Sequence, residues 1–418
     1  MGVKQKQVFQ LAKSFYKRLP KSLRPVPGDR MRGRRVKKRL TNITVIAGFS
    51  MVAAFVITRQ SGGSGFSAPA AALATGTAAP ALSSSVKELP TMDAAPLRDS
   101  KASISEESAD GYKMETGPLA VSEISGIVLH DAKRNKDLHV RVFYPVAAGK
   151  YPVIVFSHGA GGSRNCCDAL TRHWATYGYI TLQPTHDDSV AERRSGGDEA
   201  LRFPEAIRQA LKTPALWESR PQDISFLLDS LPELQKRVAG LSDKIDANRI
   251  GVAGHSMGAY TAEAVGGALV DLPGRVSSSF ADARARAVLC LSPQGPGQFG
   301  LSTNSFEKMT LPFMGITGSL DNLGPRANAA WHKTPFDRSP AGDKFEVYIQ
   351  GANHMSFVTD ESLGSARSSQ AAAIFGYTNS ASLAFWDAYL KNDSAARTFL
   401  QSDLLERYSH GAAKLARR

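Results

Sequence analysis

A serine in a glycine-rich pentapeptide is the residue whose surroundings most clearly predict chemistry. Residues 254–258 read Gly-His-Ser-Met-Gly, the pattern G-x-S-x-G, directly after a short apolar run. Between a strand and a helix, this pattern places the serine on a sharp turn with its hydroxyl exposed, and the glycines permit close backbone packing. A helix starting at Met257 would bring its positive end toward a developing oxyanion. Ser256 is therefore the candidate nucleophile.

Two later residues could complete a proton relay with Ser256. Asp321 and His354 each follow a further short apolar run. The chain order Ser, Asp, His is the one expected for such a triad on a parallel sheet. His354 would take the proton of Ser256 and return it to the leaving group, while Asp321 would orient the imidazole and stabilise its charged form.

A glycine-rich turn, His-Gly-Ala-Gly-Gly at residues 158–162, follows an earlier apolar run. Such a turn can direct a backbone N–H toward a substrate carbonyl oxygen. We expect the amides of Ala160 and Met257 to form an oxyanion hole, in which each donor contributes about 3–4 kcal/mol of transition-state stabilisation. An ordinary tight turn is the alternative, and a phosphate-binding loop would require a Gly-Lys-Ser/Thr that is missing here.

Side chains close to these motifs are candidates for the wall of a substrate pocket. They are His158, His186, His255 and Trp331. His186 begins a His-Asp-Asp run that would also suit a metal ion, but no fourth ligand is evident, so we expect neither a metal nor a cofactor. Asp187 and Asp337 stay open as alternatives to Asp321 for the acid of the relay.

The elements that must position these residues are short apolar runs separated by longer segments. The runs lie at 153–156, 179–182, 250–253, 287–291, 313–316 and 345–349. The better helix candidates are 168–177, 221–231, 257–270 and 380–390. Short buried strands that alternate with helices predict an α/β fold, with a mostly parallel sheet and helices on both faces. Alternating segments at 126–129 and 138–144 predict an antiparallel hairpin before it.

Residues 187–220 form a stretch too long for a plain connection between two elements. It contains a helix-like piece at 204–212 and Trp217. At the carboxyl edge of the sheet, such an insertion predicts a cap over the substrate pocket, with a surface excursion as the alternative.

Charge and hydropathy divide the 418 residues into an amino-terminal part and a body. Residues 1–39 carry 14 Lys and Arg and one acid, Asp29, which accounts for the whole formal net charge of +13. Residues 40–58 are uncharged and long enough to cross a bilayer as a helix, so they predict a membrane anchor behind a basic cytoplasmic arm. The stretch 59–116 has the composition of a flexible linker, and 117–418 would form the catalytic domain.

This topology would place the catalytic domain outside the cytoplasm, in the periplasm or the extracellular space. The alternative is a long signal peptide, from which the protein would be secreted after cleavage. Because the body is neutral, it offers no footprint for a phosphate backbone, and we expect no nucleic-acid partner. Cys166, Cys167 and Cys290 give no disulfide framework. The adjacent pair is interpreted as two free thiols, with a vicinal disulfide as the alternative.

Four motifs in correct order resemble those of the α/β-hydrolase superfamily. They occupy residues 158–164, 220–226, 254–260 and 351–357. More narrowly, they are similar to predicted dienelactone hydrolases and platelet-activating-factor acetylhydrolase-like enzymes of bacteria. Over about 120–395, the resemblance implies an α/β-hydrolase fold and serine-dependent ester cleavage. It assigns Ser256, Asp321 and His354 to the triad and Ala160 and Met257 to the oxyanion hole.

We therefore expect a serine hydrolase that cleaves carboxylic esters, of short acyl or phospholipid-acetyl type, through an acyl-enzyme intermediate. Lipase, polyester hydrolase, thioesterase and peptidase activities stay open, because one fold hosts many chemistries. A non-catalytic envelope binding module that keeps the fold is the alternative from another class, and the complete Ser, Asp and His set argues against it.

Overall fold

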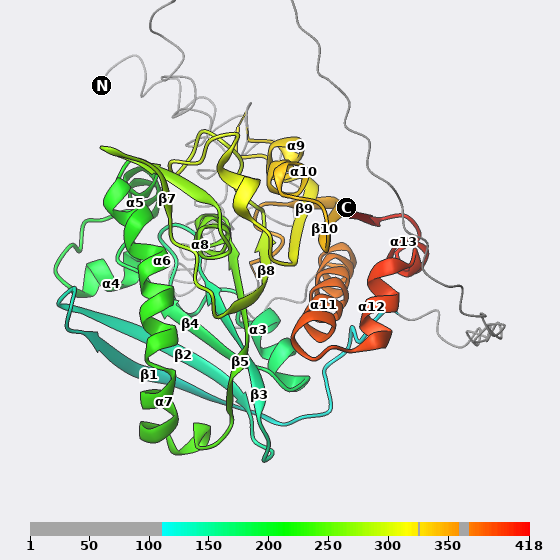
Figure 1. Cartoon of the computed structure of the whole chain (residues 1–418), viewed down its shortest axis with the longest axis horizontal. Helices are drawn as coiled ribbons and strands as arrows, with labels where there is room; N and C mark the ends of the chain where they lie inside the picture. Colours follow the sequence, from blue (N-terminus) through cyan, green and yellow to red (C-terminus); the bar gives the residue numbers. More distant parts are fainter. Residues whose placement is uncertain (1–110, 325–326, 359–367) are drawn as a thin grey trace, which may run out of the picture. The chain divides into compact units, whose positions relative to one another are not determined.

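The computed structural model describes residues 111–324, 327–358 and 368–418. Within these residues, nine strands form one sheet in the order β1-β2-β4-β3-β5-β8-β9-β10-β11 (Figure 1). They are β1 (Val121–Asp131), β2 (Lys136–Pro145), β3 (Tyr151–Ser157), β4 (Ile180–Thr185), β5 (Ile245–His255), β8 (Ala285–Leu291), β9 (Phe313–Leu320), β10 (Lys344–Asn353) and β11 (Ala413–Arg417). The central strands from β4 to β10 are parallel, whereas β1, β2 and β11 pair antiparallel. The predicted α/β class and the predicted hairpin are confirmed.

Helices cover both faces of this sheet. The longer ones are α3 (Asp168–Thr176), α5 (Phe203–Ala210), α6 (Pro214–Asp229), α8 (Met257–Val265), α11 (Ser369–Leu390) and α12 (Ser394–Gln401). The shorter ones are α4 (Val190–Ser195), α7 (Leu231–Arg237), α9 (Ala329–His332), α10 (Thr334–Arg338) and α13 (Leu404–Tyr408), with 3₁₀ turns at Ala239–Leu241 and Ser305–Lys308. A separate hairpin pairs β6 (Leu269–Leu272) with β7 (Arg275–Ser279).

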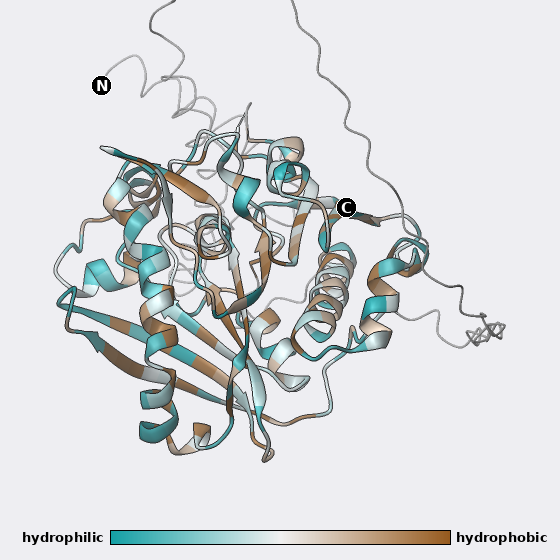
Figure 2. Cartoon of the chain, viewed as in Figure 1, coloured by the Kyte–Doolittle hydropathy of each residue, from teal (hydrophilic) through white to brown (hydrophobic). Residues whose placement is uncertain are grey.

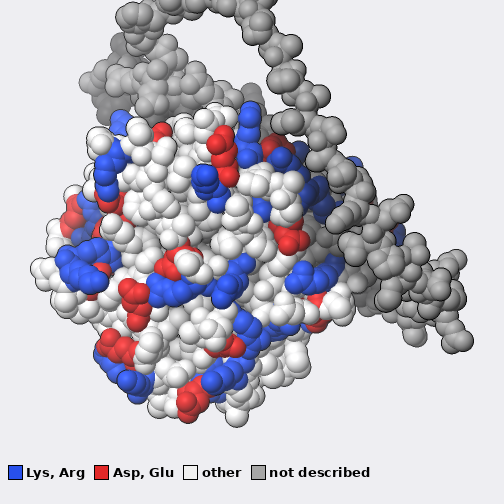
Figure 3. All heavy atoms as spheres, in the orientation of Figure 1, with Lys and Arg blue, Asp and Glu red and all other residues white. Residues whose placement is uncertain are grey.

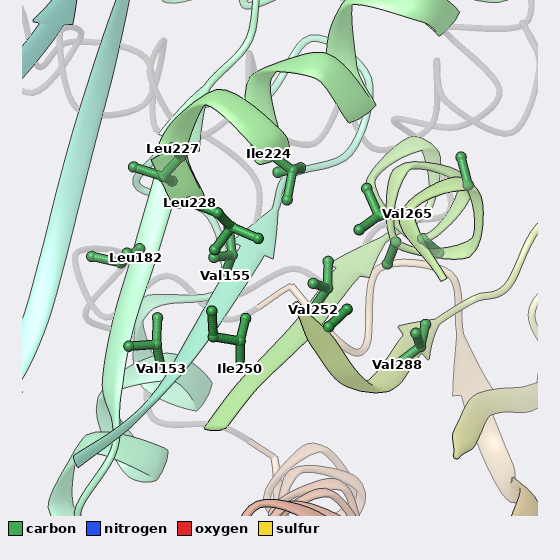
Figure 4. Close-up of a cluster of buried hydrophobic side chains, with 14 of the residues drawn as sticks. Val153, Val155, Leu182, Ile224, Leu227, Leu228, Ile250, Val252, Val265 and Val288 are labelled. Carbon is green, nitrogen blue, oxygen red and sulfur yellow. The ribbon is translucent and has the colours of Figure 1, made fainter. Parts of the chain in front are cut away.

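Alternate residues of β3 enter two different cores. Val153 and Val155 lie in the core that α6 and α8 cover, and Figure 4 shows α6 residues beside them. Ile154 and Phe156 lie in the opposite core, against α3 and α11. Because both faces are buried, the central strands appear in the sequence as continuous apolar runs, and Figure 2 shows hydrophobic colour along them.

Three predicted helix boundaries were wrong. The helix predicted over 380–390 starts at Ser369, and the other two differ for identifiable reasons. The helix predicted over 257–270 ends at Val265, because Gly266 and Gly267 follow and Gly267 takes a φ of 111°. The apolar residues after them form β6 instead. The helix predicted over 221–231 starts earlier, at Pro214, and contains Pro221 in its interior. A proline inside a helix frees a carbonyl one turn earlier, and here the Tyr260 hydroxyl donates to the Trp217 carbonyl at 2.9 Å.

The insertion 187–220 contains α4, α5 and the first turns of α6. Val190, Leu201 and Ala206 form a small apolar cluster with Phe203. The Phe203 ring also packs against the loop of residues 158–162, since a methyl group at Gly161 would lie 3.1 Å from it. The insertion therefore lies against the loop that was predicted to hold the oxyanion.

The predicted arm 1–39, the apolar segment 40–58 and the linker up to residue 110 lie outside the described residues. No helix in 111–324, 327–358 or 368–418 is both long and apolar enough to span a bilayer. The Tyr112 hydroxyl and the Lys113 ammonium both donate to Asp387 of α11. The start of the described chain is thus attached to the body. On the face shown in Figure 3, basic and acidic side chains are interspersed.

Candidate active site

Ser256 occupies the sharp turn between β5 and α8. Its backbone has φ 57° and ψ −118°, a conformation that non-glycine residues rarely adopt. A Cβ atom at Gly258 would overlap the Ser157 carbonyl oxygen, and one at Gly254 would overlap the Gly258 carbonyl oxygen. Only glycine fits at these two positions. The turn leaves the Ser256 side chain partly exposed at the carboxyl end of β5.

Asp321 and His354 meet at the ends of the neighbouring strands β9 and β10. His354 Nδ1 lies 2.9 Å from Asp321 Oδ1, and both residues are buried. With its Nδ1–H donated to the carboxylate, the imidazole keeps Nε2 as the acceptor, as a base acting on a serine requires. Within the described residues, no hydrogen bond joins Ser256 to His354. In ligand-free enzymes such contacts are often long.

The buried Asp321 carboxylate is surrounded by donors. Its Oδ2 accepts from the Ser292 hydroxyl at 2.7 Å and from the Thr317 hydroxyl at 2.9 Å. Burial acts to raise the pKa of Asp321, but the neighbouring His354 and His332 outweigh it and hold this pKa well below its usual range. Asp321 is therefore ionised at neutral pH and can stabilise an imidazolium beside it.

A second histidine, His332, approaches the same carboxylate. Its Nε2 lies 3.2 Å from Asp321 Oδ1, without hydrogen-bond alignment, and its Nδ1 donates to the Pro293 carbonyl at 2.6 Å. In the described part of the chain, Asp321, His332 and His354 are the group whose donor atoms lie close enough together to hold a metal ion. In this arrangement, Asp321 Oδ1 accepts from His354 and only lies close to His332.

His255, the residue before the nucleophile, connects the two ends of the site. Its Nε2–H donates to the His354 carbonyl at 2.9 Å, and the two rings lie 4.7 Å apart. Burial, with the nearby His354, lowers the pKa of His255 to about 3, so this ring is neutral at neutral pH. Through this hydrogen bond, His255 supports the turn that carries His354.

The loop 158–162 lies beside the nucleophile. A methyl group at Gly159 would come 3.5 Å from the Ser256 Cβ atom. The amides of Gly161 and Gly162 donate to Asp188 and to the Gly159 carbonyl. Among the described residues, the Ala160 amide has no acceptor, and the Met257 amide lies in the first turn of α8, where amides lack intrahelical partners. Both N–H groups are thus available to a ligand.

The predicted pocket residues have other surroundings. His158 and His186 are each 1% exposed and bond within the protein through both ring nitrogens, and His255 is 3% exposed and donates from Nε2 to the His354 carbonyl. These three rings are therefore buried in the protein interior and do not form the wall of an open pocket. Trp331 is partly exposed and donates its indole N–H to the Pro296 carbonyl at 2.9 Å.

The alternative acids lie elsewhere. Asp187 pairs with Lys136 at 2.7 Å, and Asp337 pairs with Lys333 at 3.3 Å. Among the described residues, neither forms a hydrogen bond or an ion pair with His354, whereas Asp321 does. The sulfurs of the adjacent Cys166 and Cys167 lie 3.1 Å apart, longer than a disulfide bond.

Sequence reasoning missed four buried polar residues around these groups: Asp188, Arg220, Asp223 and His332. A signal for two of them was present. Arg220 and Asp223 are on the face of α6 that also carries the buried Ile224 and Leu227. A charge on the apolar face of a helix indicates a buried partner. His332 itself had no such signal in the sequence.

Comparison with known proteins places this chain near one group of lipid-acting enzymes. The family model described as "Platelet-activating factor acetylhydrolase, isoform II" matches residues 107–198. The platelet-activating factor acetylhydrolase of Bos taurus is 27% identical over 143 residues, which cover 27% of this chain and 31% of the relative. The enzyme of that name from Canis lupus familiaris is 28% identical over 149 residues, covering 28% and 32%.

A shorter match involves a Schizosaccharomyces pombe protein named as a candidate phospholipase A2, 44% identical over 50 residues, which cover 12% of this chain and 11% of the relative. The chain thus spans less than a third of the length of these relatives in two cases and about a ninth in the other. The mostly parallel sheet and the family match agree on the fold. The chain is an α/β-hydrolase-fold protein that resembles the platelet-activating factor acetylhydrolases over residues 107–198.

Proposed function

We propose that the chain is a serine hydrolase of carboxylic esters, acting on short acyl or phospholipid-type acetyl esters. One observation carries the proposal. His354 Nδ1 lies 2.9 Å from Asp321 Oδ1 at the carboxyl ends of the strands, the same edge of the sheet at which Ser256 occupies its sharp turn. The acetylhydrolase names of the mammalian relatives favour an acetyl ester as the substrate.

The reaction would proceed in two balanced halves. Ser256 Oγ attacks the ester carbonyl carbon while His354 Nε2 takes the hydroxyl proton, and the carbonyl oxygen becomes an oxyanion facing the amides of Ala160 and Met257. The carbon–oxygen bond to the alcohol breaks, and the imidazolium gives its proton to the leaving oxygen. Water then attacks the acyl-enzyme with His354 as base, which releases the carboxylic acid and restores Ser256.

The test compares p-nitrophenyl acetate, butyrate and octanoate as substrates of the full chain, kept in mild detergent. Ser256→Ala should lose ester turnover by about 10³-fold or more, as removal of a triad nucleophile does. Ser394→Ala is the control, because this serine is exposed at the start of α12 and should keep the turnover of the parent chain.

The chain-length profile separates related activities. A preference for acetate would support the acetyl-ester proposal, whereas a preference for octanoate would indicate a lipase. Folded protein that hydrolyses no ester would contradict the proposal and favour a peptidase or a binding module. Turnover that survives Ser256→Ala would overturn the choice of nucleophile.

We also propose that residues 40–58 anchor this hydrolase with its folded body outside the cytoplasm. The support is the sequence alone: a basic arm before an uncharged stretch of membrane-spanning length. Protease added to spheroplasts should digest the body of the protein and spare the arm. Protection of the whole chain, or recovery of the body in the soluble fraction, would contradict the anchor.

A further inference from the structure

Two sequence motifs without a role in the proposed chemistry meet behind the loop 158–162. One is the Arg220-Pro-Gln-Asp223 segment of α6, and the other is the His186-Asp-Asp188 segment after β4. Asp188 and Arg220 are each 1% exposed and form a two-point ion pair. Arg220 Nε donates to Asp188 Oδ1 at 2.9 Å, and its Nη2 donates to Asp188 Oδ2 at 2.8 Å. Such a fork fixes the orientation of both groups.

This ion pair holds the backbone of the loop 158–162 at several atoms. Arg220 Nη1 donates to the His158 carbonyl at 2.6 Å, and Nη2 lies 3.3 Å from the Gly159 carbonyl. Asp188 Oδ2 accepts from the Gly161 amide at 2.7 Å. The carbonyls before Ala160 and the amide after it are therefore tied to the same two side chains, which leaves the peptide of Ala160 between fixed points.

A second buried pair, His186 and Asp223, lies beside the first. The imidazole Nδ1–H of His186 donates to Asp223 at 2.7 Å, and its Nε2 accepts from the Ser157 hydroxyl at 2.9 Å. The amide of His186 donates to His158 Nε2 at 3.0 Å, which leaves His158 Nδ1–H to donate to the Gly159 carbonyl at 2.7 Å. The end of β3, which leads into the loop, and the end of the neighbouring β4 are thus both joined to α6.

Each buried charge of this network faces a group of opposite charge. Asp223 also accepts from Arg134 at 2.7 Å and from Lys136 at 2.8 Å. Burial acts to raise the pKa of Asp188, but the adjacent Arg220 outweighs it, so this pKa is lowered and the carboxylate stays ionised. Burying the charged side chains of Asp188, Arg220 and Asp223 together with the His186 imidazole costs free energy. Apolar residues would fill the space at lower cost, so the observed set calls for a reason beyond stability.

We propose that Arg220 and Asp188 are positioning residues that hold the Ala160 amide ready to receive the oxyanion. This inference rests on the proposed ester hydrolysis. A donor that is already aligned costs no reorganisation when charge develops on the carbonyl oxygen. The pair touches no substrate, so its effect should fall on turnover and not on ground-state binding.

The test uses three variants of the full chain: Arg220→Gln, Asp188→Asn and the double variant Arg220→Met with Asp188→Leu. The single variants leave one member of the pair without its charged partner. The double variant removes both charges and keeps the volume apolar, which a fold tolerates far better. Arg284→Gln is the matched control, because Arg284 pairs with Asp282 at 2.6 Å away from the loop.

Two kinetic readouts distinguish positioning from simple loss of fold. For p-nitrophenyl acetate, we expect kcat to fall about a hundredfold in Arg220→Gln and in the double variant, with KM changed less than about threefold. The preference for the ester over its thionoester should also fall by about tenfold, because sulfur is a poor hydrogen-bond acceptor and gains little from an aligned amide. Asp188→Asn should keep part of the activity, since its amide oxygen can still accept from Gly161.

A structural readout makes the inference independent of the substrate. In hydrogen exchange, peptides covering 157–163 should lose protection in the double variant, while peptides of β9 and α11 should not. Unchanged exchange in that segment, or unchanged kcat and thionoester preference in a folded double variant, would overturn the inference. If the parent chain shows no Ser256-dependent ester cleavage, the proposed function fails, and the exchange result alone decides whether the pair holds the loop.

Discussion

The two sides of the candidate site are supported by different kinds of contact. On the oxyanion side, the loop 158–162 is tied to the ion pair of Asp188 and Arg220. On the acid side, Asp321 accepts from hydroxyl groups, and its ion-pair partners within the described residues are imidazoles. One side uses a permanent cation, and the other uses hydroxyl groups and imidazoles.

In the proposed acyl transfer, the two sides have different tasks, and this difference agrees with them. The oxyanion side must be aligned before the substrate arrives and keeps its charge throughout, so a permanent guanidinium suits it. The acid side must respond when His354 becomes an imidazolium. A fixed cation beside Asp321 would compete with that imidazolium for the carboxylate and weaken the base. The hydroxyl donors of Ser292 and Thr317 carry no net charge, so the Asp321 carboxylate can still stabilise the imidazolium of His354.

The largest effect is expected from breaking the acid side. Asp321→Asn should retain a side chain of the same size but present the wrong partner to His354 Nδ1, and kcat for p-nitrophenyl acetate should fall about 10⁴-fold. Steady-state kinetics measure this loss. Asp337→Asn is the control, because Asp337 pairs with Lys333 on α9–α10, and its turnover should match that of the parent chain. Equal losses in both variants would contradict the assignment of Asp321.

On the oxyanion side, the largest effect on stability is expected from separating the buried pair. Arg220→Ala leaves Asp188 charged and buried, and the free energy of unfolding should fall by about 3–5 kcal/mol. Urea denaturation followed by circular dichroism gives this value. The double variant with both charges removed should lose much less. An Arg220→Ala chain as stable as the parent would show that the pair is not desolvated as described.

A lone buried carboxyl on α8 gives a contrast in pH dependence. Burial raises the pKa of Glu263 to about 8, and its partner is the Gln294 amide, not a cation. Between about pH 4.5 and 8, the unfolded chain releases this proton while the folded chain retains it, so stability falls as pH rises, by up to about 5 kcal/mol. Glu263→Gln should remove this slope, measured as the difference in unfolding free energy between the two chains from pH 5 to 8.

The sign of this slope distinguishes the two kinds of carboxyl group. Asp188, whose pKa is lowered by Arg220 against the effect of burial, contributes stability at neutral pH that is lost in acid. Glu263 contributes in the opposite direction. Identical pH slopes for the parent and Glu263→Gln would mean that Glu263 is solvated or has a charged partner.

The smallest effect is expected from one hydroxyl on the acid side. Thr317→Val removes the donor 2.9 Å from Asp321 Oδ2 and leaves the donor from Ser292. A loss of about 1–2 kcal/mol in carboxylate stabilisation predicts a kcat lowered about tenfold. Thr398→Val, in an exposed turn of α12, provides the control. No change in Thr317→Val would assign the support of Asp321 to Ser292 alone.

The sheet could be predicted because each central strand is buried on both faces. Val153 to Phe156 alternate between two cores, so all four positions are apolar and stand out from the segments around them. The helix end at Val265 was missed because apolar residues continue beyond the glycine pair into β6. The start of α6 was missed because Pro221 resembles a first helical residue.

In the candidate site, the residues that follow strands could be predicted, and those that support them could not. Ser256, Asp321 and His354 each stand at a strand end, which is where a parallel sheet gathers its chemistry. The contacts of Arg220 with the loop 158–162 join positions 62 residues apart in the chain, and no local pattern predicts them. They depend on how α6 packs across β3 and β4.

The most direct test of the account is to trap the acyl-enzyme. The full chain is mixed with p-nitrophenyl acetate, quenched in acid within the first turnovers, digested and analysed by mass spectrometry. The account predicts one acetyl group on the peptide that contains Ser256 and no acetyl group on that peptide in Ser256→Ala. In His354→Gln, the acetyl group should accumulate if that variant retains acylation. Acetylation at another residue, or rapid ester hydrolysis with no acyl group on Ser256, would contradict a serine acyl-enzyme at this site.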